Sequence, residues 1–210
     1  MLHILFLIAI TAEAMTAALA AGRRSMDWVG VCLLGCVTAL GGGSARDVLL
    51  GHYPLTWVEH PYYLAITAGA ALATIFLPKI MRHLHQLFLL LDAVGLVVFT
   101  VIGCNVAMQL GLPTGVVIVS GMITGCVGGV LRDVLCNEIP LLFRRELYAS
   151  VSVITGCLYI AGLYLGYPHL LVTIGAMLVG LALRLLALRF EWNMPKFVYA
   201  EEKTADPGDR

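Results

Sequence analysis

The chain has 210 residues, of which 60% are hydrophobic and 12% are charged, and its formal net charge at pH 7 is zero. Soluble domains average about 45–50% apolar and about 25% charged residues. This composition, with a mean hydropathy of +0.92, excludes an ordinary soluble protein. It predicts an all-α integral membrane protein whose surroundings are the lipid bilayer, and we expect no nucleic-acid partner.

Seven apolar runs, each bounded by charged or turn residues, predict membrane-spanning helices. Together they nearly exhaust the chain, so we expect a single transmembrane domain over residues 1–197, followed at 198–210 by a charged, disordered tail. The predicted spans are Leu2–Gly22, Trp28–Leu50, Tyr62–Leu77, Leu87–Met108, Thr114–Cys136, Leu147–Leu165 and Leu170–Arg189.

A sequence motif occurs twice, 86 residues apart. The string Gly42-Gly43-Ser44-Ala45-Arg46-Asp47-Val48-Leu49 returns as Gly128-Gly129-Val130-Leu131-Arg132-Asp133-Val134-Leu135. Each half holds three predicted spans, an odd number, so the second half must enter the membrane from the opposite face. We therefore expect an inverted 3+3 repeat, with repeat one at about 1–86, repeat two at about 87–168 and a seventh helix outside the repeat at about 169–190.

Consecutive glycines interrupt the second and fifth predicted helices, at Gly41-Gly42-Gly43 and at Gly128-Gly129. Small residues often serve close helix packing in membranes, but each glycine costs about 1 kcal/mol of helix propensity relative to alanine. We expect a kink or a short unwound segment at both positions. Ser44 and Asp47 have the spacing of a capping box, which predicts that a new half-helix begins at Ser44.

Four charged residues follow these glycines: Arg46, Asp47, Arg132 and Asp133. Adjacent residues lie about 100° apart on a helix, so we expect neither arginine to pair with the aspartate beside it. Ionised side chains within a membrane usually belong to a pathway or to a structural network, and both interpretations stay open. Further candidate partners are Glu13, Asp92, Asn105 and Arg184.

Charge asymmetry predicts the orientation. Lys and Arg residues outside the spans all fall on alternate connections, beginning with Arg23 and Arg24, so the amino terminus is expected outside and the carboxyl terminus in the cytoplasm.

The six cysteines lie in or at the ends of spans, where we interpret them as packing residues. We expect no metal site and no cofactor beyond a permeant potassium or sodium ion. Because the chain has no paired catalytic residues and no nucleotide motif, we do not expect an enzyme.

The motifs GGGSARDVLLGHYPL and GGVLRDVLCNEIPL resemble those of the bacterial branch of the trimeric intracellular cation channel family, also labelled a glycine transporter domain family. The resemblance implies a homotrimer in the bacterial inner membrane, with one pore in each subunit that conducts monovalent cations, chiefly potassium. A secondary transporter of a small amino acid such as glycine is the alternative. Animal members carry Lys-Glu-Val where this chain has Arg46-Asp47-Val48, so their gating is not carried over.

By position, the resemblance implies a pore between the second and fifth helices. Its expected lining or kink residues are Thr38, Gly41, Gly42, Gly43, Ser44, Thr124, Gly128 and Gly129. Its expected gating or charge network consists of Arg46, Asp47, Arg132 and Asp133.

Overall fold

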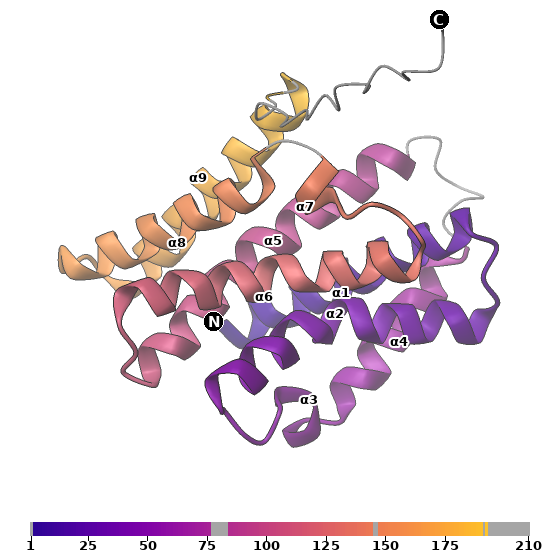
Figure 1. The fold of residues 1–210 in the computed structure, drawn as a ribbon, viewed down its shortest axis with the longest axis horizontal. Helices are drawn as coiled ribbons and strands as arrows, with labels where there is room; N and C mark the ends of the chain where they lie inside the picture. The colour runs from indigo at the N-terminus through magenta and orange to yellow at the C-terminus, as the bar shows by residue number, and fades with distance from the viewer. Residues whose placement is uncertain (1, 77–83, 145–146, 191, 193–210) are drawn as a thin grey trace, which may run out of the picture.

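The structure is a computed structural model that describes residues 2–76, 84–144, 147–190 and 192, and every regular element in these ranges is a helix (Figure 1). Each predicted span coincides with one helix to within a few residues, although the predicted end of the third span, Leu77, lies outside the described residues; two four-residue helices, Thr56–Glu59 and Leu141–Arg144, were not predicted. The predicted tail lies outside the described residues. The helices are α1 (Leu2–Arg23), α2 (Trp28–Leu50), α3 (Thr56–Glu59), α4 (Tyr62–Thr74), α5 (Leu84–Gln109), α6 (Thr114–Leu135), α7 (Leu141–Arg144), α8 (Tyr148–Tyr164) and α9 (His169–Arg189).

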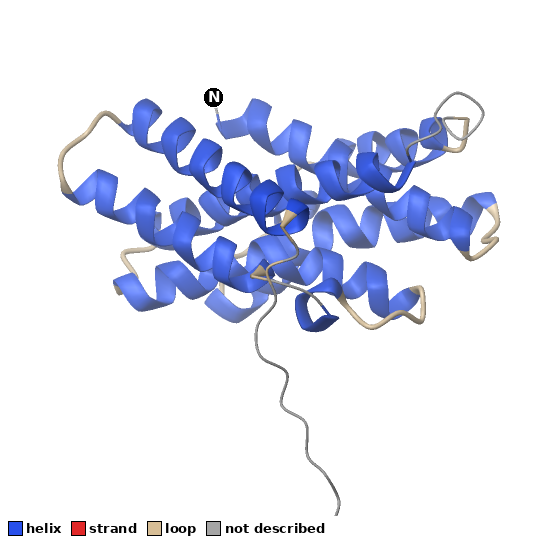
Figure 2. Ribbon diagram, turned by 90° about the horizontal axis from the view of Figure 1, so that it is seen from above, coloured by secondary structure: helices blue, strands red, loops and turns tan. Residues whose placement is uncertain are grey.

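Helices α1, α2, α5, α6 and α9 are each at least 21 residues long and apolar enough to cross a membrane, since about 20 residues span the hydrocarbon core. Helices α4 and α8 are equally apolar but shorter, with 13 and 17 residues. The helices run side by side along the long axis of the molecule, and most connections gather at its two ends (Figure 2). The chain is therefore a helical membrane protein that crosses the bilayer several times.

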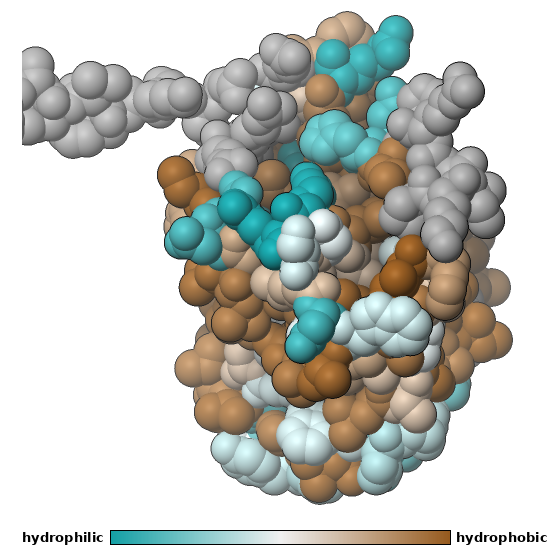
Figure 3. Space-filling model, turned by 90° about the vertical axis from the view of Figure 1, so that its right-hand side faces the viewer, coloured by the Kyte–Doolittle hydropathy of each residue, from teal (hydrophilic) through white to brown (hydrophobic). Residues whose placement is uncertain are grey.

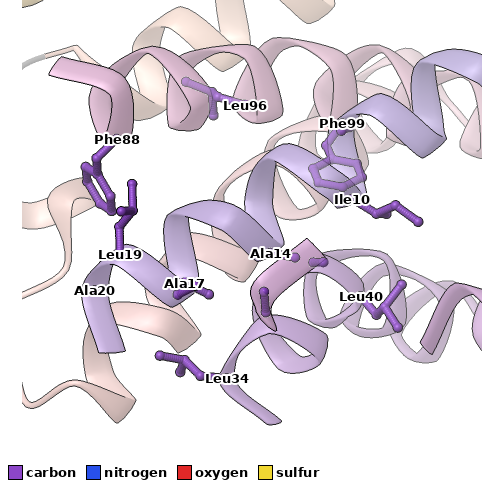
Figure 4. Packing of buried hydrophobic residues seen from close by; sticks show 14 of the residues in the cluster. Ile10, Ala14, Ala17, Leu19, Ala20, Leu34, Leu40, Phe88, Leu96 and Phe99 are labelled. Atoms are coloured by element: carbon purple, nitrogen blue, oxygen red, sulfur yellow. The ribbon is translucent and has the colours of Figure 1, made fainter. Parts of the chain in front are cut away.

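Helices α1 and α5 pack against each other and form the centre of the bundle. Much of their interface is apolar, with Ile10 close to Phe99 and Leu19 close to Phe88 (Figure 4). Between these larger side chains α1 presents alanines such as Ala14 and Ala17, both fully buried. Small side chains let membrane helices approach closely, which explains how α1 contacts α2, α4 and α5 at once.

The helix contacts of the second half reproduce those of the first. Helix α2 packs on α1 and α4, and α6 packs on α5 and α8. Both helices also end in the same way: Gly51 (φ 66°) and Asn137 (φ 53°), 86 residues apart, adopt the left-handed conformation. Glycine and asparagine are the residues that tolerate this conformation after a helix, so the repeat extends to local backbone geometry.

Candidate functional site

Helices α2 and α6 cross with their backbones in direct contact. A Cβ atom added to Gly42 would collide with the carbonyl oxygen of Thr124, and one added to Gly128 would collide with the carbonyl oxygen of Thr38. Residue numbers rise along α2 where they fall along α6, so the helices are antiparallel. Because the two contacts are related by the 86-residue repeat, the crossing lies at the centre of the internal symmetry.

The predicted unwound segments are absent from α2 and α6, both of which are described throughout. Helical structure continues through the glycines of both helices, so that prediction is wrong, and a bend without a break stays a prediction. The Ser44 hydroxyl donates to the carbonyl oxygen of Leu40 (2.8 Å), so the predicted capping box and half-helix start are wrong as well. The glycines serve close approach instead, and the helix continues past them in both cases.

Arg132 of α6 is fully buried within a cluster of carboxyl groups. Its Nε lies 2.9 Å from Asp133 Oδ1, and one terminal nitrogen lies 2.9 Å from Asp92 Oδ1 and 3.7 Å from Glu13 Oε2. The same nitrogen donates to the Thr16 hydroxyl (3.0 Å). Three carboxyl groups from three helices thus share one guanidinium group, whose single positive charge offsets part of the cost of burying them.

Arg46 of α2, the counterpart of Arg132, is 4% exposed and has a simpler environment. Its Nε and a terminal nitrogen bind Asp47 Oδ1 at 2.9 and 2.7 Å. His52 Nδ1 lies 3.0 Å from the same oxygen, and the Thr56 hydroxyl donates to Asp47 Oδ2 (3.1 Å). Trp57 Nε1 donates to the Ser44 hydroxyl (3.2 Å), so α3 is tied to the end of α2.

The prediction that neighbouring arginine and aspartate residues do not pair is wrong for both copies. Adjacent residues on a helix point about 100° apart, but the long arginine side chain folds back to the neighbouring carboxylate. Both partners are buried, so little water competes for the ion pair. Glu13 and Asp92 are confirmed as partners of Arg132. Two other candidates lie elsewhere: Asn105 donates to the Tyr159 hydroxyl (3.1 Å), and the Arg184 guanidinium lies 4.7 Å above the Tyr148 ring.

A cavity of about 220 Å³ opens at the end of the molecule where α1 and α6 finish. Its polar lining includes Arg23, Arg24, Asp133 and Glu138, and Arg24 forms a salt bridge with Glu138. Figure 3 looks at this end: hydrophilic residues gather in its upper half and hydrophobic residues cover its flanks. Arg132 lies behind the cavity wall, with its guanidinium 4.5 Å above the ring of Phe88.

A second, smaller void lies beside Arg46. It measures about 10 Å³ and is lined by Gly43, Ser44, Arg46 and Thr124, together with aromatic residues from α1, α3 and α5. A void of this size holds about one water molecule. Four predicted residues therefore surround one small space, while Gly42, Gly128, Thr38 and Thr124 form the crossing itself.

The other predicted residues occupy different positions. A Cβ atom at Gly41 would meet Leu131 Cδ1 at 2.6 Å, so this glycine also serves packing. A Cβ atom at Gly129 would lie 3.3 Å from the Tyr148 hydroxyl, on the Arg132 side. Sequence reasoning missed the aromatic lining of the small void, which consists of Phe6, Trp57 and Phe99. The signal that could have found Phe6 and Phe99 is their position in the repeat.

The fold and these charges define the class: a helical membrane protein whose two halves make the same contacts and bury an Arg-Asp pair on either side of a central antiparallel crossing. Comparison with known families is specific. The family described as "Glycine transporter" matches residues 3–79 and 89–164, well over half of the chain, and the chain belongs to this family.

Individual relatives extend the comparison. The "UPF0126 inner membrane protein YadS" of Escherichia coli K12 is 39% identical over 190 residues, covering 90% of this chain and 92% of that protein. A UPF0126 membrane protein of Vibrio cholerae is 35% identical over 198 residues, covering 94% and 83%.

Solved structures match as closely. The trimeric intracellular cation (TRIC) channel orthologue from Rhodobacter sphaeroides is 35% identical and superposes with a TM-score of 0.87, over 90% of this chain and 97% of that one. A structure described under "Structural basis for conductance through TRIC cation channels" is 35% identical with a TM-score of 0.85, over 95% and 98%.

Proposed function

We propose that the chain is a cation channel, permeable to potassium, with a pathway inside one subunit beside the α2–α6 crossing. The observation that carries this proposal is the match to a TRIC cation channel structure over 95% of the chain at 35% identity. The buried charges support it, since ionisable residues deep within membrane helices are costly and commonly mark ion pathways.

The pathway would join the cavity at Asp133 to the void at Arg46, past Thr38 and Thr124. The tight contact of Gly42 with Thr124 would close this route, so the structure would correspond to a non-conducting state. Potassium or sodium would be the permeant ion, and the proposal requires no bound cofactor. Opening would require α2 and α6 to separate slightly or to slide.

We further propose that α4 and α8 complete seven membrane spans and that three copies assemble in the bacterial inner membrane. An odd number of spans places the termini on opposite sides. The basic end, with Arg23 and Arg24, would face the cytoplasm by the positive-inside rule. Apolar side chains exposed on α9, such as Leu171 (63% exposed) and Leu178 (60% exposed), would contact lipid or a neighbouring subunit.

The second candidate, a secondary transporter of glycine, rests only on the family description "Glycine transporter". Purified protein in planar bilayers and in liposomes separates the two. Discrete unitary currents that reverse at the potassium equilibrium potential are expected for the channel. Saturable uptake of labelled glycine without unitary currents would contradict the channel and support the transporter.

A further inference from the structure

At positions that correspond in the 86-residue repeat, the α1–α5 pair carries acidic side chains at one end and aromatic side chains at the other. Phe6 corresponds to Asp92, and Phe99 corresponds to Glu13, each 86 residues apart. Asp92 and Glu13 meet Arg132. Phe6 and Phe99 line the small void together with Arg46, the counterpart of Arg132. Acidic side chains thus surround one buried arginine, and aromatic side chains stand in the same positions beside the other.

The two phenylalanines are in ring contact. Their ring centroids lie 6.1 Å apart at an interplanar angle of 69°, an edge-to-face arrangement. Phe6 also meets the Tyr63 ring at 4.8 Å, and Phe99 is 5% exposed. The space that remains beside them is about 10 Å³, against about 220 Å³ at the other end. The narrow end of the arrangement is therefore its aromatic end.

We infer that the edge-to-face pair of Phe6 and Phe99 forms the apolar constriction of the pathway on the Arg46 side of the crossing. This inference rests on the proposed function and deepens it by naming the element that limits flux. Aromatic rings cannot replace the water around a cation, and narrow apolar constrictions stop conduction by losing their water. The adjacent Arg46 guanidinium is paired with Asp47, so the constriction offers a cation no unpaired carboxylate in place of its water.

The opposite end has the complementary property. Glu13 and Asp92 offer carboxylate oxygens where the constriction offers rings, and Asp92 Oδ2 has no hydrogen-bond partner among the described residues. The main barrier to a cation therefore lies at the aromatic end, away from these carboxyl groups. Movement of the Phe6 and Phe99 side chains out of the void would lower this barrier without any change in the fold.

The first experiment measures initial potassium flux into liposomes, per amount of folded protein, for Phe6→Ala, Phe99→Ala and Phe99→Leu. Phe143→Ala is the matched control, because Phe143 is 74% exposed on α7. Opening an apolar constriction should raise flux about threefold or more in both alanine variants and less in Phe99→Leu, with no change in the control. Equal flux in the wild type and both alanine variants would overturn the inference.

A second readout does not depend on conduction. Ser44 lines the same void, so the rate at which a cationic thiol reagent modifies Ser44→Cys reports water access past the rings. This rate, followed at position 44 by mass spectrometry, should rise about tenfold when Phe99→Ala is added and less when Phe99→Leu is added. An unchanged rate would reject the constriction.

The two readouts separate the inference from the proposed function. A wild-type protein that conducts potassium while neither readout responds to Phe6 and Phe99 contradicts the constriction alone. A wild-type protein without potassium current whose Ser44→Cys reactivity still rises contradicts the channel, and it supports the aromatic pair as the barrier of a different transport pathway.

Discussion

The backbone of Gly42 lies so close to the carbonyl oxygen of Thr124 that a methyl group at position 42 would collide with it. The repeat makes the same contact in reverse, from Gly128 to Thr38. Helices α2 and α6 are thus in backbone contact at two symmetry-related points, and only small residues fit there. A slight separation of the two helices would therefore widen the space between them.

Gly42→Ala and Gly128→Ala should each destabilise the protein, by about 1–3 kcal/mol, because an added methyl group overpacks a tight contact. The cost arises at backbone atoms, which cannot move aside as a flexible side chain can. Thermal unfolding of the detergent-solubilised protein measures the effect. Gly69→Ala is the control, since a Cβ atom there meets nothing within 4 Å, and equal melting temperatures for all three variants would contradict the described crossing.

Asp92→Asn should be strongly destabilising, on the order of 3 kcal/mol, because it removes one partner from a buried ion-pair cluster. Glu138→Gln provides the contrast: its salt bridge with Arg24 has side chains that are 39% and 40% exposed, and exposed pairs contribute about 0–1 kcal/mol. Comparing the midpoints of thermal unfolding tests the ranking. Similar losses in both variants would show that Arg132 does not depend on Asp92.

Thr56→Val should loosen α3 from the end of α2, because it leaves Asp47 Oδ2 without its described donor. Asp47 is fully buried, and leaving a buried acceptor without its hydrogen-bond donor costs about 1–3 kcal/mol. Hydrogen exchange should therefore accelerate in the connection after α2, from Gly51 to Leu55. Thr114→Val, which removes an exposed contact with Tyr164, should leave that exchange unchanged. If the Gly51–Leu55 amides exchange as slowly in Thr56→Val as in the wild type, the Thr56–Asp47 hydrogen bond does not hold α3 against α2.

The proposed orientation predicts different behaviour of reporters fused to the carboxyl terminus. A green fluorescent protein fusion should fluoresce and an alkaline phosphatase fusion should be inactive, since Lys and Arg residues mark the cytoplasmic side. Active phosphatase at this end would reverse the orientation. Substituting Arg23 and Arg24 by glutamate should weaken the preference, which links the result to the basic residues.

The helices were predictable from the sequence because apolar runs of membrane length leave little choice of secondary structure. Helix α2 begins at Trp28 and ends at Leu50, as predicted. Its start is also readable, since Asp27 accepts a hydrogen bond from the Gly30 amide (2.7 Å) at the N-cap. The short helices α3 and α7 escaped notice because four residues show no periodicity.

The site was only partly predictable. The duplicated motif located α2, α6 and their buried charges, and Glu13 and Asp92 were identified as candidate partners. The low helix propensity of glycine suggested that α2 and α6 are interrupted. The contact of Gly42 with Thr124 shows instead that the glycines allow close backbone packing. The angle between adjacent residues on a helix suggested that Arg46 and Asp47 do not pair. The arginine side chain is long enough to reach Asp47 nevertheless. The aromatic pair becomes visible only when the repeat is combined with the positions of α1 and α5 around both arginines.

The central claim, that cations pass beside the α2–α6 crossing, is tested most directly at Gly43. A Cβ atom there meets only an Arg46 nitrogen, at 3.8 Å, so alanine fits at this position, whereas a leucine side chain would fill and exceed the void of about 10 Å³. Potassium current in planar bilayers should fall progressively from wild type through Gly43→Ala to Gly43→Leu, whereas Gly69→Leu, at an exposed position of α4, should conduct normally. Undiminished current in a folded Gly43→Leu protein would place the pathway elsewhere.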